Sequence, residues 1–370
     1  MRIVKATVSL YRIVPYQEGQ EPHADAVQVV EAVEAVVVRL FTDRDIDGLG
    51  FTYTIGRGGA AIKCILEKEL VPLVIGEDPL NSERIWQKLW WACHWVGRAG
   101  ITTMGIAAVD NAIWDLKGKC FGEPLYRLLG GCRDKVPAYV TDSGWINLPL
   151  EEVKNSSRKF VEAGFKGVKI KVGRDKAEED LERVSEVRKV VGTGVEVRID
   201  ANHKFTIDEA VRRANLLKDL DISWFEEPLE SSHPQAHATL RSKSPIPIAL
   251  GESLYSKYEF RDYIEQRAVD IVQPDAGRIG ITEWLKVAYL AECWGIPVAP
   301  HAFSEIHAHL VAAIPNGLIV EYFAGLGSLL VNPFKVERGE ITIPQTPGTG
   351  VEFSQERIGR FLVEETSLGM

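Results

Sequence analysis

The alternation of apolar and polar positions changes at about residue 135. From there on, short runs rich in valine and isoleucine alternate with longer segments in which apolar and charged residues interleave at helical spacing. This alternation is typical of βαβ units, in which helices connect parallel strands. Helices are expected over 150–163, 178–191 and 206–220, among others. The predicted strands cover 136–141, 167–172, 195–200, 222–227, 246–252, 271–275, 297–300 and 319–322. These eight strands in series predict a closed barrel.

The first 130 residues follow a different pattern. Strand-like runs at 7–13 and 32–41 and a turn-rich stretch at 48–59 precede helical patterns at 81–91 and 103–120. The tail after about Pro333 is rich in glycine and proline, and we expect it to pack back on the N-terminal unit. The prediction is an α/β fold: an α+β capping domain over 1–130, a TIM-like (β/α)7β barrel over 131–335, and a C-terminal segment, 336–370, that completes the capping domain.

Composition and charge narrow the classes of partner. A net charge of −9 offers no basic surface for nucleic acid or for an anionic membrane. No apolar run reaches the ~18–20 residues of a membrane span, and the first residues lack the pattern of a secretory signal. The five cysteines are scattered and form no CxxC pair, which favours a reducing compartment. We therefore expect a cytoplasmic protein that binds neither nucleic acid nor membrane, and we expect a homo-oligomer.

Ionisable residues lie where the predicted barrel strands end. In a β/α barrel these carboxyl ends form the face that carries the active site. The residues are Lys169, Lys171, Asp200, Glu226, Glu227, Glu252, Asp275, His301 and Glu321. Alternation along a strand places the two lysines on the same side, where mutual repulsion should lower the pKa of at least one. A lysine tuned in this way can accept a proton from carbon. An outward-facing pair on an edge strand is the structural alternative.

Three of these acids, Asp200, Glu226 and Glu252, end successive strands. Three carboxylates at one rim repel one another strongly unless a cation lies between them. Mg²⁺ suits such a group because it prefers oxygen ligands, and Mn²⁺ is a possible substitute. Pairing of each acid with a separate lysine, or capping of a helix, is the alternative for any single one.

The motifs around these residues resemble the mandelate racemase subgroup of the enolase superfamily in order and approximate spacing. In the capping part, the segments 48–53 and 114–117 are also similar to that family, so the resemblance covers nearly the whole chain. The chain looks closest to acid-sugar dehydratases of the talarate or galactarate type. The barrel motifs are Lys169-Ile170-Lys171, Asp200-Ala201-Asn202, Glu226-Glu227-Pro228, Gly251-Glu252, Asp275 with Gly277, Pro300-His301 and Glu321.

The resemblance implies a role for each matching position. Asp200, Glu226 and Glu252 would bind Mg²⁺, with Glu227 behind them. Lys171 would act as one acid/base and Lys169 would lie close to the substrate carboxylate. His301, oriented by Asp275, would act on the opposite face. Glu321 would donate a hydrogen bond to the substrate carboxylate, which requires a protonated acid with a raised pKa.

Such a site removes the proton next to a carboxylate of a small-molecule substrate. We favour dehydration of an aldonate or aldarate to a 2-keto-3-deoxy acid, with racemisation or epimerisation of a 2-hydroxy acid as the alternative. A noncatalytic binding protein is a further alternative, but no residue of the constellation is missing. For substrate binding we expect Asn202 and His203 behind the third barrel strand. Two capping-domain residues, His23 and Arg57, are expected to meet the distal part of the substrate.

Overall fold

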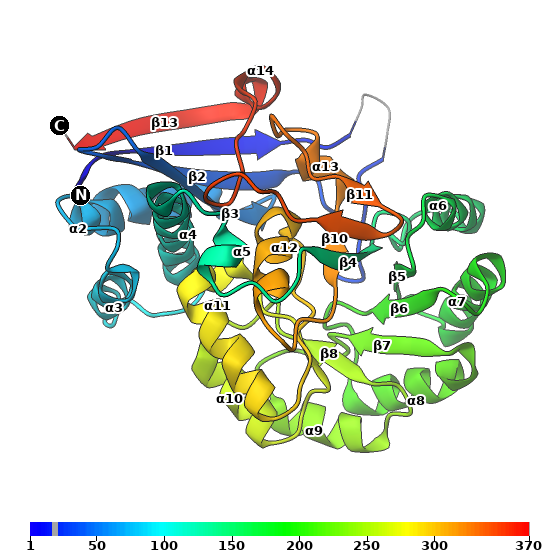
Figure 1. Ribbon diagram of the computed structural model, residues 1–370. Helices are drawn as coiled ribbons and strands as arrows, with labels where there is room; N and C mark the ends of the chain where they lie inside the picture. The colour runs from blue at the N-terminus through cyan, green and yellow to red at the C-terminus, as the bar shows by residue number, and fades with distance from the viewer. Residues whose placement is uncertain (17–20, 370) are drawn as a thin grey trace.

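The computed structural model describes residues 1–16 and 21–369, in two packed parts (Figure 1). The smaller part is built on an antiparallel sheet of four strands in the order β13-β1-β2-β3. The red C-terminal strand β13 lies along the blue N-terminal strand β1 in Figure 1. The bounds of these strands are β1 Ile3–Ile13, β2 Val33–Thr42, β3 Asp47–Ile55 and β13 Leu362–Gly369.

Helices pack on this sheet, and the most extensive of these contacts is that of α4 (Ile101–Phe121) with β3. Gly48 and Gly50 allow this contact, because a Cβ atom on Gly50 would lie 2.2 Å from the carbonyl oxygen of Ala108. The predicted helices at 81–91 and 103–120 are both found. The helical segments of this part are α1 Gly59–Ile65, the π-helical Leu66–Leu70, α2 Val71–Val74, α3 Ser82–Ala92, α4 and α5 Leu125–Leu128.

The larger part is the predicted barrel. Its parallel strands pair in chain order, and β10 closes the ring by pairing with β4. The strands are β4 Lys135–Val140, β5 Gly167–Lys171, β6 Glu196–Asp200, β7 Ile222–Glu226, β8 Ile248–Leu250, β9 Ile271–Val272 and β10 Val320–Tyr322. The predicted seventh strand is reduced to Val298, which bridges Val272 and Gly317. Pro297 and Pro300 flank it, and proline has no N–H to donate to a ladder.

Helices connect the barrel strands on the outside (Figure 1). They confirm the (β/α)7β architecture, and the three helices expected at 150–163, 178–191 and 206–220 end within a few residues of the predicted bounds. The helices are α6 Leu150–Glu162, α7 Ala177–Val191, α8 Ile207–Leu217 with a 3₁₀ turn at Lys218–Leu220, α9 Pro234–Lys243, α10 Lys257–Glu265, α11 Ala276–Cys293, α12 Ser304–Ala313 and α13 Ala324–Gly327.

The C-terminal segment differs in part from the prediction. Only its last strand, β13, joins the capping sheet, whereas β12 (Glu340–Thr342) pairs with the first residues of β4 and with β11 (Val336–Glu337). The physical reason is that β10 pairs with β4 only from Ala138 onward, so the start of β4 would otherwise be an open edge. Between the two attachments lie α14 (Gln355–Ile358) and the 3₁₀ turn Gly359–Phe361.

The capping part is held on the barrel by contacts between α4 and α11. Asp110 of α4 accepts hydrogen bonds from the backbone N–H of Thr282 at 2.7 Å and from its hydroxyl at 2.6 Å. The helix α11 is interrupted just before this point at Gly280, which has φ 75°. A Cβ atom at Gly280 would lie 2.8 Å from Asp110 Oδ2, so glycine is needed both for the backbone angle and for the contact.

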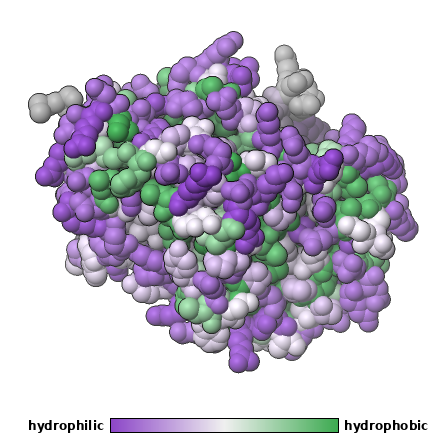
Figure 2. Space-filling view, in the orientation of Figure 1, coloured by the Kyte–Doolittle hydropathy of each residue, from purple (hydrophilic) through white to green (hydrophobic). Residues whose placement is uncertain are grey.

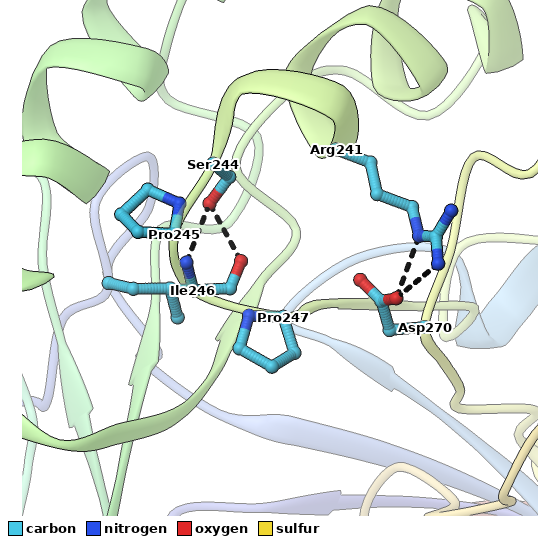
Figure 3. A pocket seen from close by; sticks show the side chains of 6 residues that line it. All are labelled: Arg241, Ser244, Pro245, Ile246, Pro247 and Asp270. Atoms are coloured by element: carbon cyan, nitrogen blue, oxygen red, sulfur yellow. Dashed lines mark hydrogen bonds and ion pairs between the residues drawn. The ribbon is translucent and has the colours of Figure 1, made fainter.

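Hydrophilic residues cover most of the face in Figure 2, with hydrophobic residues in smaller groups. A hollow of about 320 Å³ lies at the amino ends of β8 and β9, away from the predicted active-site face (Figure 3). Its charged side chains pair with each other, Arg241 Nε to Asp270 Oδ1 at 2.7 Å. Within residues 1–16 and 21–369, no helix has the length and apolar character of a membrane span.

Candidate active site

The carboxyl ends of β5, β6 and β7 bring four predicted residues together. Lys169 and Lys171 belong to β5, and Asp200 and Glu226 end the next two strands. In the parallel register Lys171 lies opposite Asp200, and Asp200 lies opposite Glu226. All four side chains are buried. Strand alternation and sheet register therefore place two ammonium groups and two carboxylates at one level of the barrel.

Glu252 follows β8 and completes a group of three carboxylates. One oxygen from each of Asp200, Glu226 and Glu252 lies within 4.8 Å of the others. In a Mg²⁺ octahedron, opposite ligands are about 4.2 Å apart, twice the metal–oxygen distance of about 2.1 Å. A small contraction would therefore bring the three oxygens onto one ion, with water or substrate oxygens as the other ligands. The donor set and its spacing fit Mg²⁺.

Neighbouring groups orient these carboxylates. Glu226 Oε2 accepts hydrogen bonds from Trp224 Nε1 at 2.9 Å and from Gln273 Nε2 at 2.8 Å. Asp200 Oδ1 accepts one from the backbone N–H of Asn202 at 3.0 Å. Asp200 Oδ1 and Glu226 Oε2 are thus held from outside the group, as is common for metal ligands, while Oδ2 and Oε1 face the two lysines.

The ionisation of the three acids reflects their crowding. Burial raises the pKa of Glu226 to about 7. Burial, together with repulsion from Glu227, raises the pKa of Glu252 to about 8. For Asp200, burial acts in the same direction, but Lys171 and Lys169 outweigh it and hold its pKa below the usual value. Too little positive charge therefore surrounds the two glutamates. A divalent cation would supply this charge, and its binding would release protons from the two carboxyl groups.

The protein's own charges do not produce the predicted lowering of a lysine pKa. Burial favours the neutral form of both lysines, but the surrounding carboxylates outweigh burial and raise the pKa of each. Lys169 Nζ lies 2.5 Å from Glu226 and 2.7 Å from Glu321. Lys171 Nζ lies 2.6 Å from Asp200. The repulsion between the two ammonium groups is present, as expected, but it is smaller than the attraction to the acids.

His301 and Asp275 form a hydrogen-bonded pair. Asp275 is the N-cap of α11, and its Oδ1 accepts a hydrogen bond from the backbone N–H of Gly277 at 2.7 Å. Its Oδ2 lies 3.0 Å from His301 Nδ1, while His301 Nε2 lies 3.3 Å from Glu252. Burial lowers the pKa of His301, but Glu252 and Asp275 outweigh burial and raise it to about 9. The second ring nitrogen therefore faces the carboxylate group.

Glu321 differs from its prediction in ionisation. Burial raises the pKa of this carboxyl, but the charges of Lys169 and His301 outweigh burial and lower it, so the protein's own charges do not produce the predicted raised pKa. The side chain accepts hydrogen bonds from the hydroxyl of Thr141 and, at 2.9 Å, from the backbone N–H of Ala302. An ionised Glu321 pairs with Lys169, and its hydrogen bond to the substrate carboxylate stays a prediction.

Two family models match most of the chain. Residues 8–130 match the model of the mandelate racemase / muconate lactonizing enzyme N-terminal domain, and residues 152–357 match the enolase C-terminal domain-like model. The chain belongs to the mandelate racemase and muconate lactonizing enzyme family. It is 35% identical over 98% of its length to 99% of the 3,6-anhydro-alpha-L-galactonate cycloisomerase of Streptomyces coelicolor. It is 36% identical over 87% of its length to 81% of the L-talarate/galactarate dehydratase of Salmonella typhimurium.

A solved structure of L-talarate/galactarate dehydratase from Salmonella typhimurium, liganded with Mg and L-lyxarohydroxamate, superposes with a TM-score of 0.95. It is 33% identical and covers 100% of this chain and 95% of its own. The chain is therefore an enzyme of the mandelate racemase and muconate lactonizing enzyme family, with the enolase-superfamily fold. Its cofactor is Mg²⁺.

Only some of the residues predicted to bind substrate lie at this site. Asn202 accepts a hydrogen bond from Lys171 Nζ at 2.9 Å. His23, from the capping part, stacks on Trp145 with ring centres 5.1 Å apart, and Lys171 Nζ lies 5.5 Å from the centre of that indole. Arg57 is exposed in the turn before α1. Its role remains a prediction, without a contact to the site among the residues that the structure describes.

His203 lies close to the site, with both of its ring nitrogens near protein groups. Its Nδ1 is 3.0 Å from the carbonyl of Leu229, and its Nε2 is 3.0 Å from Ser253 Oγ and 2.9 Å from Glu227 Oε2. Both ring nitrogens are thus engaged behind the carboxylates. Burial lowers the pKa of His203, but Glu227 outweighs burial and raises it to about 9. His203 is therefore placed to pair with Glu227, and its contact with the substrate stays a prediction.

Three residues of the site were not singled out from the sequence: Tyr53, Thr141 and Trp145. Thr141 ends the first predicted barrel strand, so the rule that selected the other residues could have found it. Trp145 lies in the loop after that strand, and its buried Nε1 has no hydrogen-bond partner within the described residues. Tyr53 was noted only as part of a family-like segment, because nothing in the sequence indicates which barrel residue it contacts.

Proposed function

We propose that this enzyme removes the α-proton of an acid sugar and eliminates the β-hydroxyl as water, giving a 2-keto-3-deoxy acid. The observation that carries the proposal is that two acid/base residues contact the same cluster of three carboxylates. Lys171 contacts Asp200, whereas His301 contacts Glu252 and is oriented by Asp275. A substrate held at the three acids would therefore have a lysine and a histidine within reach.

Asp200, Glu226 and Glu252 would hold Mg²⁺. The ion would supply positive charge against the substrate carboxylate as negative charge develops there. Lys169, which is 1% exposed and held between Glu226 and Glu321, would provide a second positive group for the same carboxylate. Fixed charges of this kind in a dry site stabilise a transition state more than water does.

Lys171 is the proposed base. It must be neutral to accept a proton, and burial already favours that form, while Asp200 is the main group that raises its pKa. Sharing the charge of Asp200 with a metal ion would lower the pKa of Lys171 toward the working range. The C2–H bond then breaks, its proton moves to Lys171 Nζ, and the electron pair is delocalised into the carboxylate.

His301 is the proposed acid. Asp275, which lies 3.0 Å from Nδ1, is one of the groups that raise the pKa of His301, and it would favour the protonated imidazole that an acid requires. Transfer of that proton to the 3-hydroxyl lets the C3–O bond break and water leave, and the resulting enol becomes a 2-keto acid when C3 is protonated. The protonated histidine favours elimination because a hydroxyl is a poor leaving group without an acid.

An isomerase is the second candidate, favoured by the similarity to a cycloisomerase over almost the whole chain. In a 3,6-anhydro acid the ring oxygen is attached at C3, so the same removal of the C2 proton would expel that oxygen and open the ring. No atom is lost, and the product is an isomer. Return of a proton to C2 from the other face would instead give the predicted racemase or epimerase.

A panel of aldonates, aldarates and 3,6-anhydro aldonates, incubated with the enzyme and Mg²⁺ in D₂O, separates these reactions. Mass spectrometry distinguishes loss of one water from isomerisation, and NMR detects the keto acid and exchange at C2. We expect a 2-keto-3-deoxy acid from at least one aldonate or aldarate. Turnover confined to anhydro acids, or exchange with inversion and no keto acid, would replace dehydration by the isomerase reading.

A further inference from the structure

Asp275 has a donor in addition to the histidine that it orients. The phenol O–H of Tyr53 donates a hydrogen bond to Asp275 Oδ2 at 2.7 Å, the oxygen that His301 Nδ1 approaches at 3.0 Å. The Tyr53 oxygen itself lies 3.3 Å from that ring nitrogen. Tyr53 belongs to β3 of the capping part, whereas Asp275 and His301 belong to the barrel. A triangle of polar atoms thus crosses the boundary between the two parts.

The ring of Tyr53 is fixed by its surroundings. It stacks on Phe303 with ring centres 5.8 Å apart and planes at 26°. On Gly277, a Cβ atom would lie 3.1 Å from Tyr53 Cε1 and 3.0 Å from Asp275 Oδ1. Glycine at position 277 therefore leaves room for the tyrosine ring and the aspartate carboxylate together. The close packing indicates that the phenol has a defined place in the site.

The protonation states of Tyr53 and Asp275 also suit a hydrogen bond from the phenol to the carboxylate. Burial raises the pKa of Tyr53 well above its usual value, so its oxygen keeps the proton. Burial raises the pKa of Asp275 too, but His301 outweighs it and brings the pKa to about 2. A neutral phenol donating to a carboxylate is a strong, directional hydrogen bond. Two donors on one oxygen fix the carboxylate plane that aims the imidazole.

We propose that Tyr53 is a positioning residue that fixes the Asp275–His301 pair, so that the seated capping domain supports the half of the reaction that uses His301. The inference rests on the proposed function in one respect, namely that the step which uses His301 is the loss of the hydroxyl. Tyr53 is placed behind the imidazole, at Nδ1, so it acts through His301. The Lys171 half of the reaction has no contact with it among the described residues.

Tyr53→Phe removes the donor and keeps the ring. Thr52→Val is a matched control, because the neighbouring Thr52 also crosses the boundary, donating to the carbonyl of Gly277 at 2.6 Å. Thr52 is fully buried and makes no contact with Asp275 or His301 that the structure records. If these hydrogen bonds only hold the capping domain on the barrel, Tyr53→Phe and Thr52→Val should behave alike.

The first measurement needs no substrate. The hydrogen-bonded ring N–H of His301 is observed by proton NMR at low field in the Mg²⁺-loaded enzyme and assigned by its loss in His301→Asn. Tyr53→Phe should shift or broaden this signal, and Thr52→Val should leave it in place. An unchanged signal in Tyr53→Phe would overturn the inference, whether or not the enzyme proves to be a dehydratase.

The second measurement separates the two halves of the reaction on a substrate from the acid-sugar panel. Tyr53→Phe should lower keto-acid formation by about 10- to 100-fold, the usual effect of losing an outer hydrogen-bond partner, and leave exchange of the α-proton by Lys171 unchanged. An equal loss of both steps, or a loss of the same size in Thr52→Val, would overturn the inference. An inactive wild type contradicts the proposed function instead, and the NMR result still decides the role of Tyr53.

Discussion

Replacing Lys169 by methionine tests whether its ammonium group holds the buried acids of the site together. The side chain is 1% exposed, with Nζ 2.5 Å from Glu226 and 2.7 Å from Glu321. Methionine keeps most of the volume but leaves both carboxylates without this partner. Removing one partner of a buried ion pair costs about 3–5 kcal/mol. We therefore expect the metal-free variant to be less stable than the wild type by an amount in this range.

The size of the effect can be converted to a melting temperature. For 370 residues, an unfolding entropy of about 2.1 cal/mol/K per residue amounts to roughly 0.8 kcal/mol/K, so Tm should fall by about 4–6 °C. Added Mg²⁺ replaces part of the missing positive charge and should raise the Tm of Lys169→Met by more than that of the wild type. Differential scanning calorimetry in EDTA and in excess Mg²⁺ measures both quantities.

The control for this experiment is Lys189→Met, at a lysine that is 70% exposed and pairs with Glu186 on the surface of α7. An exposed pair contributes little to stability, so its Tm should not change. The reasoning would be refuted by a metal-free Lys169→Met protein as stable as the wild type, or by a response to Mg²⁺ equal in the two proteins.

Two further predictions concern stability in acid and binding of the substrate. His309 accepts a backbone N–H at Nδ1 and donates to a backbone carbonyl from Nε2, so it is neutral, and burial lowers its pKa to about 4. In the unfolded chain the pKa returns to about 6.5, so the free energy of unfolding should fall by roughly 3 kcal/mol as pH drops from 6.5 to 4. Urea unfolding at several pH values should show a smaller fall in His309→Gln than in the wild type. A fall of the same size in both proteins would contradict the assignment. Loss of the ring stacked on Trp145 in His23→Ala should raise KM by about 2- to 10-fold with little change in kcat; an unchanged KM would contradict the placement of His23 beside the site.

Much of the site could be predicted because it follows from strand alternation and from the position of the strand ends in a barrel. Strand alternation places Lys169 and Lys171 on one side, and the barrel rule places the ends of successive strands at one rim. The observed register, with Asp200 opposite Lys171 and Glu226, is the direct result. The shortened seventh strand was also visible in principle, since prolines at 297 and 300 remove ladder donors.

Other features depend on contacts that spacing along the chain does not specify. Tyr53 and Asp275 are 222 positions apart and lie in different parts of the fold, so their hydrogen bond follows only from the seating of α4 on α11. The ionisation of Lys169 and Glu321 depends on the difference between burial and several charges. Sequence analysis identified the like-charge repulsion between the lysines, but it could not weigh the three carboxylates around Lys169 against it.

The separation of proton removal from loss of the hydroxyl tests the proposed mechanism most directly. With Mg²⁺ and an active acid sugar in D₂O, NMR follows exchange at C2 and formation of the keto acid in His301→Asn and in Lys171→Ala. We expect His301→Asn to exchange the α-proton without forming keto acid, and Lys171→Ala to do neither. Keto-acid formation by His301→Asn at the wild-type rate, or exchange retained in Lys171→Ala, would contradict the assignment of base and acid.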